Sequence, residues 1–191
     1  MKKIFITIFL IITGVCSASA VRYQGFIEGV AGVYLPSRIF NDGPEIGFST
    51  SHGLEIIPGL FAGVGADVLF GNYDFPDDMK YRGAEPRDAY INVFVEGRYR
   101  ILPLKKISPF VGMRLGAGYG DCYKGSRIFP YLSPALGGSF NFTRKFGMDV
   151  SIGYIFHGTI DYQHYVEPFD EEPVTDKIAN NSIQLRVGFH F

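Results

Sequence analysis

The chain has 191 residues, a length that suits one domain. Its 18 basic and 19 acidic residues leave a formal net charge of −1, which gives no electrostatic basis for binding nucleic acid. Abundant glycine, phenylalanine and tyrosine make an all-helical fold improbable on composition and favour strands.

The first 20 residues have the pattern of a secretory signal peptide. Lys2 and Lys3 precede an apolar run over residues 4–15, and Ala18-Ser19-Ala20 follows as an A-x-A cleavage site. The run is shorter than the roughly 20 residues that a membrane-spanning helix needs. We therefore predict a signal peptide over residues 1–20, removed on export, and a mature domain over residues 21–191.

The two cysteines predict no disulfide in the mature domain. Cys16 lies in the signal peptide, so Cys122 is the only cysteine that remains after cleavage. Lipidation of Cys16 is an alternative, although Val15 stands where lipoprotein signals usually have a small residue. Cys122 has no nearby base in the sequence, so we expect no catalytic role for its thiol.

The mature chain divides into segments in which apolar and polar residues alternate with period two, as in strands. Eight segments follow one another over residues 23–35, 45–56, 60–70, 88–100, 111–119, 128–142, 148–157 and 180–191. The sixth is less regular, because Pro130 and Pro134 fall on its apolar face and proline removes a ladder hydrogen bond. No segment after the signal peptide is long and apolar enough for a spanning helix, so any membrane crossing would use strands.

The charges within these segments indicate an enclosed polar interior. The lysines of the mature chain fall between the segments, whereas a sheet facing water tends to carry lysines along its exposed face. Arginine, which the segments use instead, satisfies carboxylates with its planar fork. We predict a lumenal polar network of Glu28, Asp67, Glu96, Arg98, Arg114, Asp149 and Arg186.

The positions of glycine and tyrosine also indicate a barrel with an enclosed interior. Seven glycines share the polar face, where an eight-stranded barrel has an interior just wide enough for side chains to fill: Gly63, Gly65, Gly112, Gly116, Gly118, Gly153 and Gly188. Tyrosines on the apolar face fall near segment ends, as in membrane-interface belts.

We predict an all-β, eight-stranded antiparallel up-and-down transmembrane β-barrel with a packed lumen rather than an open pore. A secreted lipocalin-like binder, whose polar face would meet water, is an alternative.

The chain resembles the small OmpA/OmpX-type outer-membrane β-barrels over nearly all of residues 21–191. "GFSTSHG" and "SPFVGMRLGAGYG" are similar to segments of that family's barrel domain. The last segment, "NNSIQLRVGFHF", alternates strictly to its final aromatic residue and resembles the signal read by the barrel-assembly machinery, here Leu185, Val187, Phe189 and Phe191. The resemblance implies an outer-membrane location, both termini in the periplasm, four loops outside the cell, and a last strand paired with the first.

No catalytic motif stands out. The sequence has no P-loop, no G-x-S-x-G, no H-E-x-x-H and no paired C-x-x-C. His157 and Thr159, followed by the acidic residues Glu167, Asp170 and Glu171, faintly resemble the His-x-Ser arrangement of barrel-type lipid A deacylases, but threonine replaces the serine. We expect a non-enzymatic protein with no metal or cofactor. A lipid A modifying enzyme is the alternative.

The expected partners are outer-membrane lipid, the barrel-assembly machinery and a possible extracellular ligand, but no nucleic acid. The ligand would meet the polar loops over residues 37–44, 72–86 and 159–177, the last of which is acidic. A structural, adhesion or host-contact role follows from this arrangement.

Overall fold

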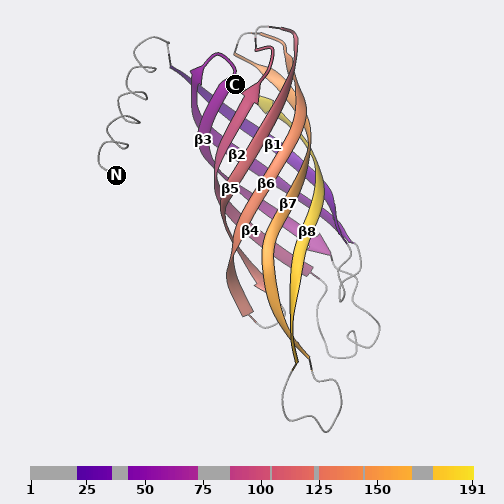
Figure 1. Ribbon diagram of the computed structural model, residues 1–191. Helices are drawn as coiled ribbons and strands as arrows, with labels where there is room; N and C mark the ends of the chain where they lie inside the picture. The colour runs from indigo at the N-terminus through magenta and orange to yellow at the C-terminus, as the bar shows by residue number, and fades with distance from the viewer. Residues whose placement is uncertain are drawn as a thin grey trace, which may run out of the picture.

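The computed structural model describes residues 21–35, 43–72, 87–103, 105–122, 125–143, 145–164 and 174–191. The expected signal peptide lies outside these residues. Eight strands form a closed antiparallel barrel (Figure 1): β1 (Arg22–Tyr34), β2 (Pro44–Ile57), β3 (Leu60–Asn72), β4 (Arg87–Arg100), β5 (Ile107–Cys122), β6 (Gly125–Asn141), β7 (Gly147–His164) and β8 (Val174–His190). The described residues include no helix that is long and apolar enough to cross a membrane. The predicted fold class is confirmed.

The strand register fixes the tilt of the barrel wall. Successive Cα partners around the barrel are Arg22, Glu55, Phe61, Arg98, Gly112, Ala135, Gly153, Gln184 and Gly32. One circuit therefore returns to β1 ten residues beyond its start. A displacement of ten residues at about 3.3 Å each, over eight strand spacings of about 4.8 Å, tilts the strands by roughly 40° from the barrel axis.

The start of β1 and the C-terminus lie together at the end of the barrel that carries the short turns, which we call the turn end (Figure 1). A two-residue turn, Pro58-Gly59, joins β2 and β3 at this end. The backbone at position 59 has φ of 88°, a conformation that favours glycine. The connections at the opposite end, the loop end, lie outside the described residues. Most residues of the predicted loops over 37–44 and 72–86 therefore lie outside the described residues.

Two pairs of strands extend past their predicted bounds. β5 continues to Cys122 and β6 begins at Gly125, whereas the sequence alternation covered only 111–119 and 128–142. β7 and β8 pair as far as His164 and Val174, so part of the predicted loop 159–177 is strand. Polar residues such as Asp161 and Gln163 favour a loop in the sequence, whereas backbone pairing needs no apolar side chain.

The two prolines of β6 lie beside an interrupted ladder. The β6–β7 pairing passes from Leu132↔Phe156 directly to Ala135↔Gly153 and omits Pro134. The pairs between β6 and β5 are continuous through Pro130 and Pro134. The missing N–H of Pro134 therefore coincides with a stretch where β6 is not paired to β7, which explains how the strand accommodates it.

The C-terminus is held by the first strand. β8 pairs with β1 from Phe26↔His190 to Tyr34↔Ser182, and this ladder closes the barrel. Two further bonds join the backbone N–H of Phe191 to the carbonyl of Gly25 (3.0 Å) and the N–H of Gly25 to the carbonyl of Phe191 (2.8 Å). The strict alternation at the chain end thus belongs to a strand that is paired on both sides, with no open edge.

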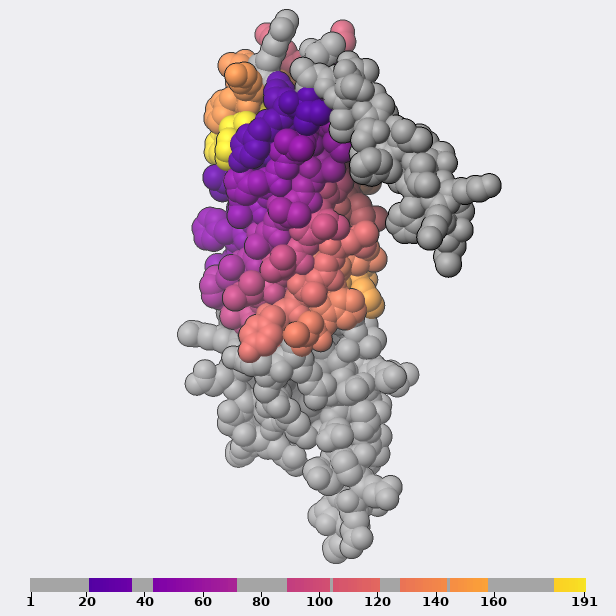
Figure 2. Space-filling model, turned by 90° about the vertical axis from the view of Figure 1, so that its left-hand side faces the viewer, coloured from indigo at the N-terminus to yellow at the C-terminus, as the bar shows by residue number. Residues whose placement is uncertain are grey.

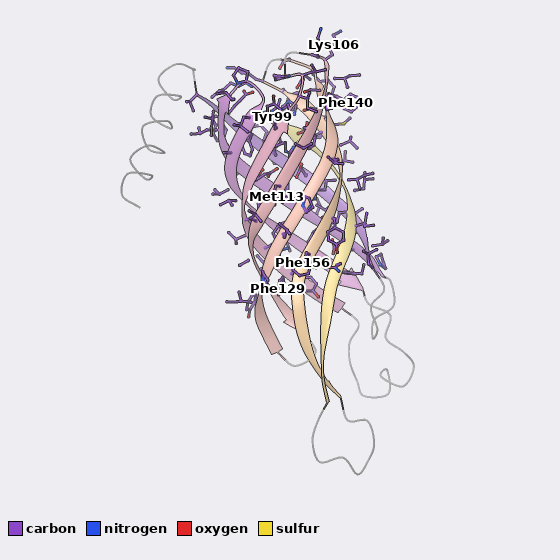
Figure 3. The ribbon with its side chains drawn as sticks, in the orientation of Figure 1. Tyr99, Lys106, Met113, Phe129, Phe140 and Phe156 are labelled. Carbon is purple, nitrogen blue, oxygen red and sulfur yellow. The ribbon has the colours of Figure 1, made fainter. Side chains whose placement is uncertain are left out.

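The barrel is inverted relative to a water-soluble domain. Its exterior is apolar, with Phe48 72% exposed and Val93, Leu115, Ile152 and Leu185 also exposed. Figure 2 shows this exterior as a continuous surface on one face, and Figure 3 shows side chains projecting from the wall along its length, including Met113. The described charged residues in the middle of the strands lie inside, whereas Arg22 at the start of β1 is partly exposed. This arrangement is opposite to that of the lipocalin-like alternative.

Candidate functional site

A network of buried ion pairs fills the middle of the lumen, with Arg98 at its centre. The Arg98 guanidinium bonds Glu28 (2.9 Å) on β1 and Asp149 (2.7 Å) on β7, and it also bonds Glu96 (2.7 Å) on its own strand. β1 and β7 are both several strands away from β4 around the wall, so these bonds cross the interior. One arginine therefore ties three regions of the wall together.

Arg114 on β5 forms the second cation of this network. It bonds Glu28, approaches Glu96 (Nε to Oε2, 3.3 Å), and donates to the Ser49 hydroxyl of β2 (3.1 Å). Glu28 and Glu96 are thus each shared between two guanidinium groups. Such sharing satisfies buried carboxylates that would otherwise be costly to remove from water.

Aromatic rings cover the two guanidinium groups. The Arg98 guanidinium carbon lies 4.0 Å from the ring centroid of Phe26 and 4.7 Å from that of Phe110. The Arg114 guanidinium carbon lies 4.7 Å from the centroid of Phe94. These stacking contacts add a cation–π attraction and exclude water.

Asp149 extends the network toward the turn end. Besides Arg98, its carboxylate accepts a hydrogen bond from the Ser139 hydroxyl and lies 3.0 Å from Nδ1 of His190. His190 is the penultimate residue of the chain, so the network reaches the strand that closes the barrel. The arrangement couples closure of the wall to filling of the lumen.

The structure places all seven predicted lumenal residues inside the barrel but brings only five of them together. Asp67 instead accepts from Asn92 (2.5 Å) and from the Tyr131 hydroxyl (3.0 Å). Arg186 donates to Ser133 (2.6 Å) and to Gln184 (3.1 and 3.2 Å), and the described residues give it no carboxylate within salt-bridge distance.

Sequence reasoning left out three partners of the predicted residues. Asn92 and Tyr131 bind Asp67, and Gln184 bridges Arg186 to Glu45, whose carboxylate accepts a hydrogen bond from the Gln184 amide. Each of these side chains has lumenal parity on its strand. Parity would have found them if neutral polar residues had been weighed with the charged ones.

The loop-end half of the lumen is aromatic. Its core cluster contains Val30, Tyr34, Leu69, Tyr90, Phe94, Phe129, Tyr131 and Ile155. His157 packs among these rings, stacked on Tyr90 at 5.2 Å between centroids and edge-to-face with Phe129 at 5.2 Å. It is 1% exposed, and neither ring nitrogen has a hydrogen-bond partner.

This placement gives no support to a deacylase site at His157. The imidazole lies in the lumen rather than on the lipid-facing exterior, and among the described residues no hydroxyl or carboxylate forms a hydrogen bond with it. The strand register also shifts between Phe156 and Thr159, so the two-residue spacing of His157 and Thr159 does not place both side chains on one face. The side chain of Thr159 lies outside the described set.

The part of the lumen around the buried ion pairs is packed. The space bounded by Glu96, Arg98, Arg114 and Arg186 leaves no cavity large enough for a water molecule. Among the described residues, no group of three or more His, Cys, Asp or Glu side chains is placed to hold a metal ion. The geometry of the interior is that of a structural plug made of ion pairs and rings.

An eight-stranded meander with an apolar exterior and a charged, packed interior defines the fold of the small OmpA/OmpX-type outer-membrane β-barrels. The sequence matches no protein-family profile and no curated protein sequence. Among solved structures, the chain is similar to Neisserial surface protein A, with a TM-score of 0.57, 13% identity, and coverage of 90% of this chain and 98% of that chain. It is also similar to the outer membrane protein OprG from Pseudomonas aeruginosa, with a TM-score of 0.54, 8% identity, and coverage of 88% and 94%. At these identities the likeness concerns the fold.

Proposed function

We propose that the protein is a non-enzymatic outer-membrane barrel that anchors surface loops and has a closed lumen. The barrel would be exported through cleavage of the signal peptide and inserted by the barrel-assembly machinery. Its work would then be structural, or adhesion or host contact through the loop end.

The inverted side-chain distribution is the observation that carries this proposal. Large apolar residues are exposed around the whole wall, whereas the described charged residues in the middle of the strands are buried. In water this exterior would far exceed the few hundred Å² of apolar patch that soluble monomers normally expose. In a bilayer the same surface meets hydrocarbon, and closure of the barrel leaves no unpaired backbone edge.

Fractionation and site-directed labelling test the membrane location. The mature protein is expected in the outer-membrane fraction, soluble only with detergent, and with gel mobility that changes on boiling. Spin labels at Val93, Leu115, Ile152 and Leu185, all exposed on the exterior, should be accessible to oxygen and protected from a water-soluble relaxation agent. A label at Lys105, in an exposed turn, is the matched aqueous control. Aqueous exposure at the four wall positions would contradict the proposal.

The composition of the loop-end connections supports a contact role for the loops. The stretch over residues 165–173, between β7 and β8, is acidic, and the long stretch over residues 73–86, between β3 and β4, is polar. Loops held on a rigid scaffold are where binding residues gather. Cells that carry the wild-type protein should bind a host-cell or matrix ligand, and deletion of residues 166–172 or 75–84 should remove that binding while the heat-modifiable band persists. Unchanged binding by both deletion variants would leave a purely structural role.

The barrel-assembly machinery is the proposed partner of the last strand. Leu185, Val187 and Phe189 face outward on β8, and Phe191 ends the same outward series. Replacing Phe189 and Phe191 together by serine should slow insertion in cells and raise the unfolded periplasmic fraction. Substituting Phe142 by serine, an exposed aromatic residue in the β6–β7 turn, is the matched control. Equal loss in both variants would argue against recognition of the final strand.

A further inference from the structure

The lysines of the mature chain gather at the two ends of the barrel. Three lie in the turns at the turn end and three at the loop end: Lys105, Lys106 and Lys145, and Lys80, Lys124 and Lys177, respectively. The connections at the turn end, residues 58–59, 101–106 and 142–146, contain no Asp or Glu, whereas those at the loop end contain many. The connections therefore give the barrel a positive end and a negative end.

The two turns that carry the turn-end lysines are fastened to one another. The backbone N–H of Asn141, the last residue of β6, bonds the carbonyl of Lys106 (2.8 Å), and its side-chain amide donates to the carbonyl of Lys105 (2.7 Å). In the β6–β7 turn, the Thr143 hydroxyl accepts a hydrogen bond from the backbone N–H of Lys145 (3.2 Å). The three lysines are therefore held on one edge of the barrel, which we call the lysine rim.

The lysine rim presents uncompensated positive charge. Its three lysines are exposed, and among the described residues no carboxylate lies within salt-bridge distance of their ammonium groups. Glu55, an acidic residue at this end, is engaged with Arg22 (2.6 Å) and with the backbone N–H of Gly59 (2.8 Å). The terminal carboxylate of Phe191 accepts a hydrogen bond from the N–H of Gly25 (2.8 Å). Both acids are thus tied to the barrel itself.

Apolar side chains lie in the same turns as the lysines. Five of them are exposed: Ile101, Leu102, Ile107, Phe142 and Phe146. Figure 3 shows Lys106 at the tip of the turn end, beyond Tyr99, which is also exposed on the wall. Tyrosine marks the headgroup level of a bilayer, and lysines near it extend their ammonium groups toward the lipid phosphates. A soluble acidic polymer would leave the apolar residues without a partner, so this mixture favours a lipid surface.

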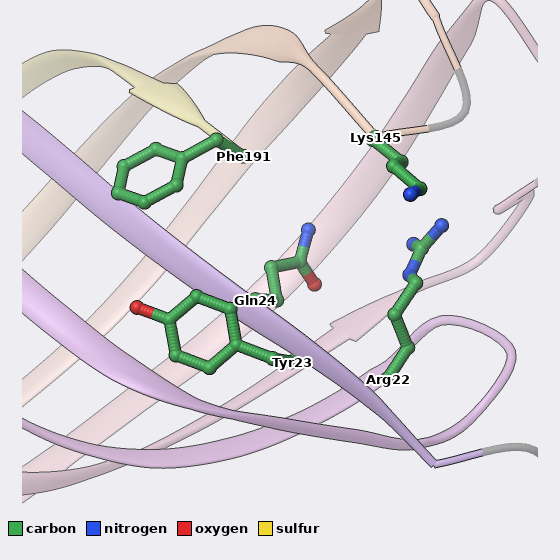
Figure 4. A pocket seen from close by; sticks show the side chains of 5 residues that line it. All are labelled: Arg22, Tyr23, Gln24, Lys145 and Phe191. Atoms are coloured by element: carbon green, nitrogen blue, oxygen red, sulfur yellow. The ribbon is translucent and has the colours of Figure 1, made fainter.

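A cavity of about 270 Å³ adjoins the lysine rim at Lys145, and Phe191 and the start of β1 form its other side. Figure 4 shows the side chains of Lys145 and Arg22 extending toward one another in this cavity. Because Arg22 is engaged with Glu55, we assign the available charge to the lysines alone. The cavity leaves room beside Lys145 for a lipid headgroup.

We propose that the lysine rim binds the phosphate groups of anionic phospholipids in the leaflet at the turn end. Lysine ammonium groups are compact charges with three rotatable donors, which suit phosphates that arrive in varied orientations. The flanking apolar residues would meet the first carbons of the acyl chains. The rim would thereby hold the positive end of the barrel in its leaflet. The proposal rests on the membrane location argued above and adds the headgroup class.

A competition between phosphatidylglycerol and phosphatidylcholine tests the lysine rim. The mature protein in detergent receives both lipids, and native mass spectrometry counts each one retained. Replacing the three rim lysines together by glutamine should lower the preference for phosphatidylglycerol by more than about tenfold, because each lysine near an anionic lipid surface contributes about fivefold. Replacing them by arginine should preserve the preference. The matched control removes the same charge at the loop end and should bind as the wild type does: Lys80→Gln, Lys124→Gln and Lys177→Gln.

The outcomes separate this inference from the membrane location. Equal loss in the rim variant and the loop-end control would overturn the rim, because total charge would then decide the preference. Displacement of phosphatidylglycerol by polyglutamate at the same concentration of charge would assign the rim to a soluble acidic partner and overturn the lipid proposal. An unchanged preference in a rim variant that keeps its heat-modifiable band would overturn the rim and leave the barrel proposal standing. Failure of the barrel proposal would appear instead as aqueous exposure of the labelled wall positions in the wild type.

Discussion

Phe191, the last residue of the chain, is paired through both its backbone groups with Gly25 near the start of the first strand. Its ring also fills the space beside Gly25, where an added Cβ would lie 2.8 Å from the ring, and it lies 6.4 Å from the His52 ring. The chain end is therefore a structural joint at the seam between β1 and β8. The aromatic terminus contributes by backbone pairing and by ring packing together.

Deleting Phe191 should separate these two contributions. The deletion removes two backbone hydrogen bonds, each contributing about 1 kcal/mol, and a large apolar side chain, so we expect a loss of about 2–4 kcal/mol in the free energy of unfolding. Phe191→Leu keeps the backbone bonds and should cost less than half as much. Urea unfolding in phospholipid vesicles measures both, and equal losses in the two variants would mean that the backbone pairing adds nothing.

Removal of Arg98 should be far more damaging than removal of Arg22. Arg98→Met leaves Glu28, Glu96 and Asp149 buried with fewer counter-charges, and breaking a buried pair costs about 3–5 kcal/mol. The Arg22 side chain, which pairs with Glu55, is 37% exposed to solvent, so Arg22→Met should cost less than about 1 kcal/mol. The same unfolding experiment compares the two, and a small effect at Arg98 would show that the network does not hold the barrel together.

The sequence predicted the strands well because a two-sided wall imposes a strict rule on side chains. One face must be apolar to meet lipid and the other must fit a narrow lumen, so parity assigned Arg98, Asp149 and Glu28 to the interior. Strand ends were predicted less well. Beyond Tyr119 and Phe156 the alternation fades while backbone pairing continues, so the bounds of β5 to β8 were set too short.

Parity could not identify which lumenal residues meet. Contact between Glu28 and Arg98 depends on the ten-residue offset accumulated around the barrel and on the reach of a long side chain across it. Neither quantity is encoded locally. For the same reason, Arg186 was grouped with the ion pairs although it bonds neutral partners, and the cavity beside Lys145 gave no signal in the sequence.

Gly118 and Gly97 should respond in opposite ways to alanine. A Cβ at Gly118 would lie 2.0 Å from the Phe129 ring and 2.3 Å from the Asn92 side chain, so Gly118→Ala forces the packed lumen apart and should cost about 1–3 kcal/mol. At Gly97 a Cβ would meet nothing within 4 Å, so Gly97→Ala should be neutral or slightly stabilising. The temperature at which the gel band moves from the folded to the unfolded position measures the stability of each variant. Similar shifts in the two variants would contradict the idea that lumenal glycines make room for rings.

The packed ion-pair layer of the lumen predicts that the protein does not conduct ions. A continuous water path would require the Arg98 and Arg114 groups to leave Glu28 and Glu96, and it would also have to pass the rings of Phe94 and the other aromatic residues of the loop-end half. Breaking one buried pair costs about 3–5 kcal/mol, which at about 1.4 kcal/mol per tenfold limits open states to roughly 10⁻² to 10⁻⁴ of the population. Planar-bilayer recordings should therefore show no sustained steps above those of detergent alone. Glu28→Gln with Glu96→Gln, which weakens the attraction without changing side-chain volume, should raise the frequency of brief openings, whereas stable wild-type channels would mean that the ion-pair plug is not a barrier.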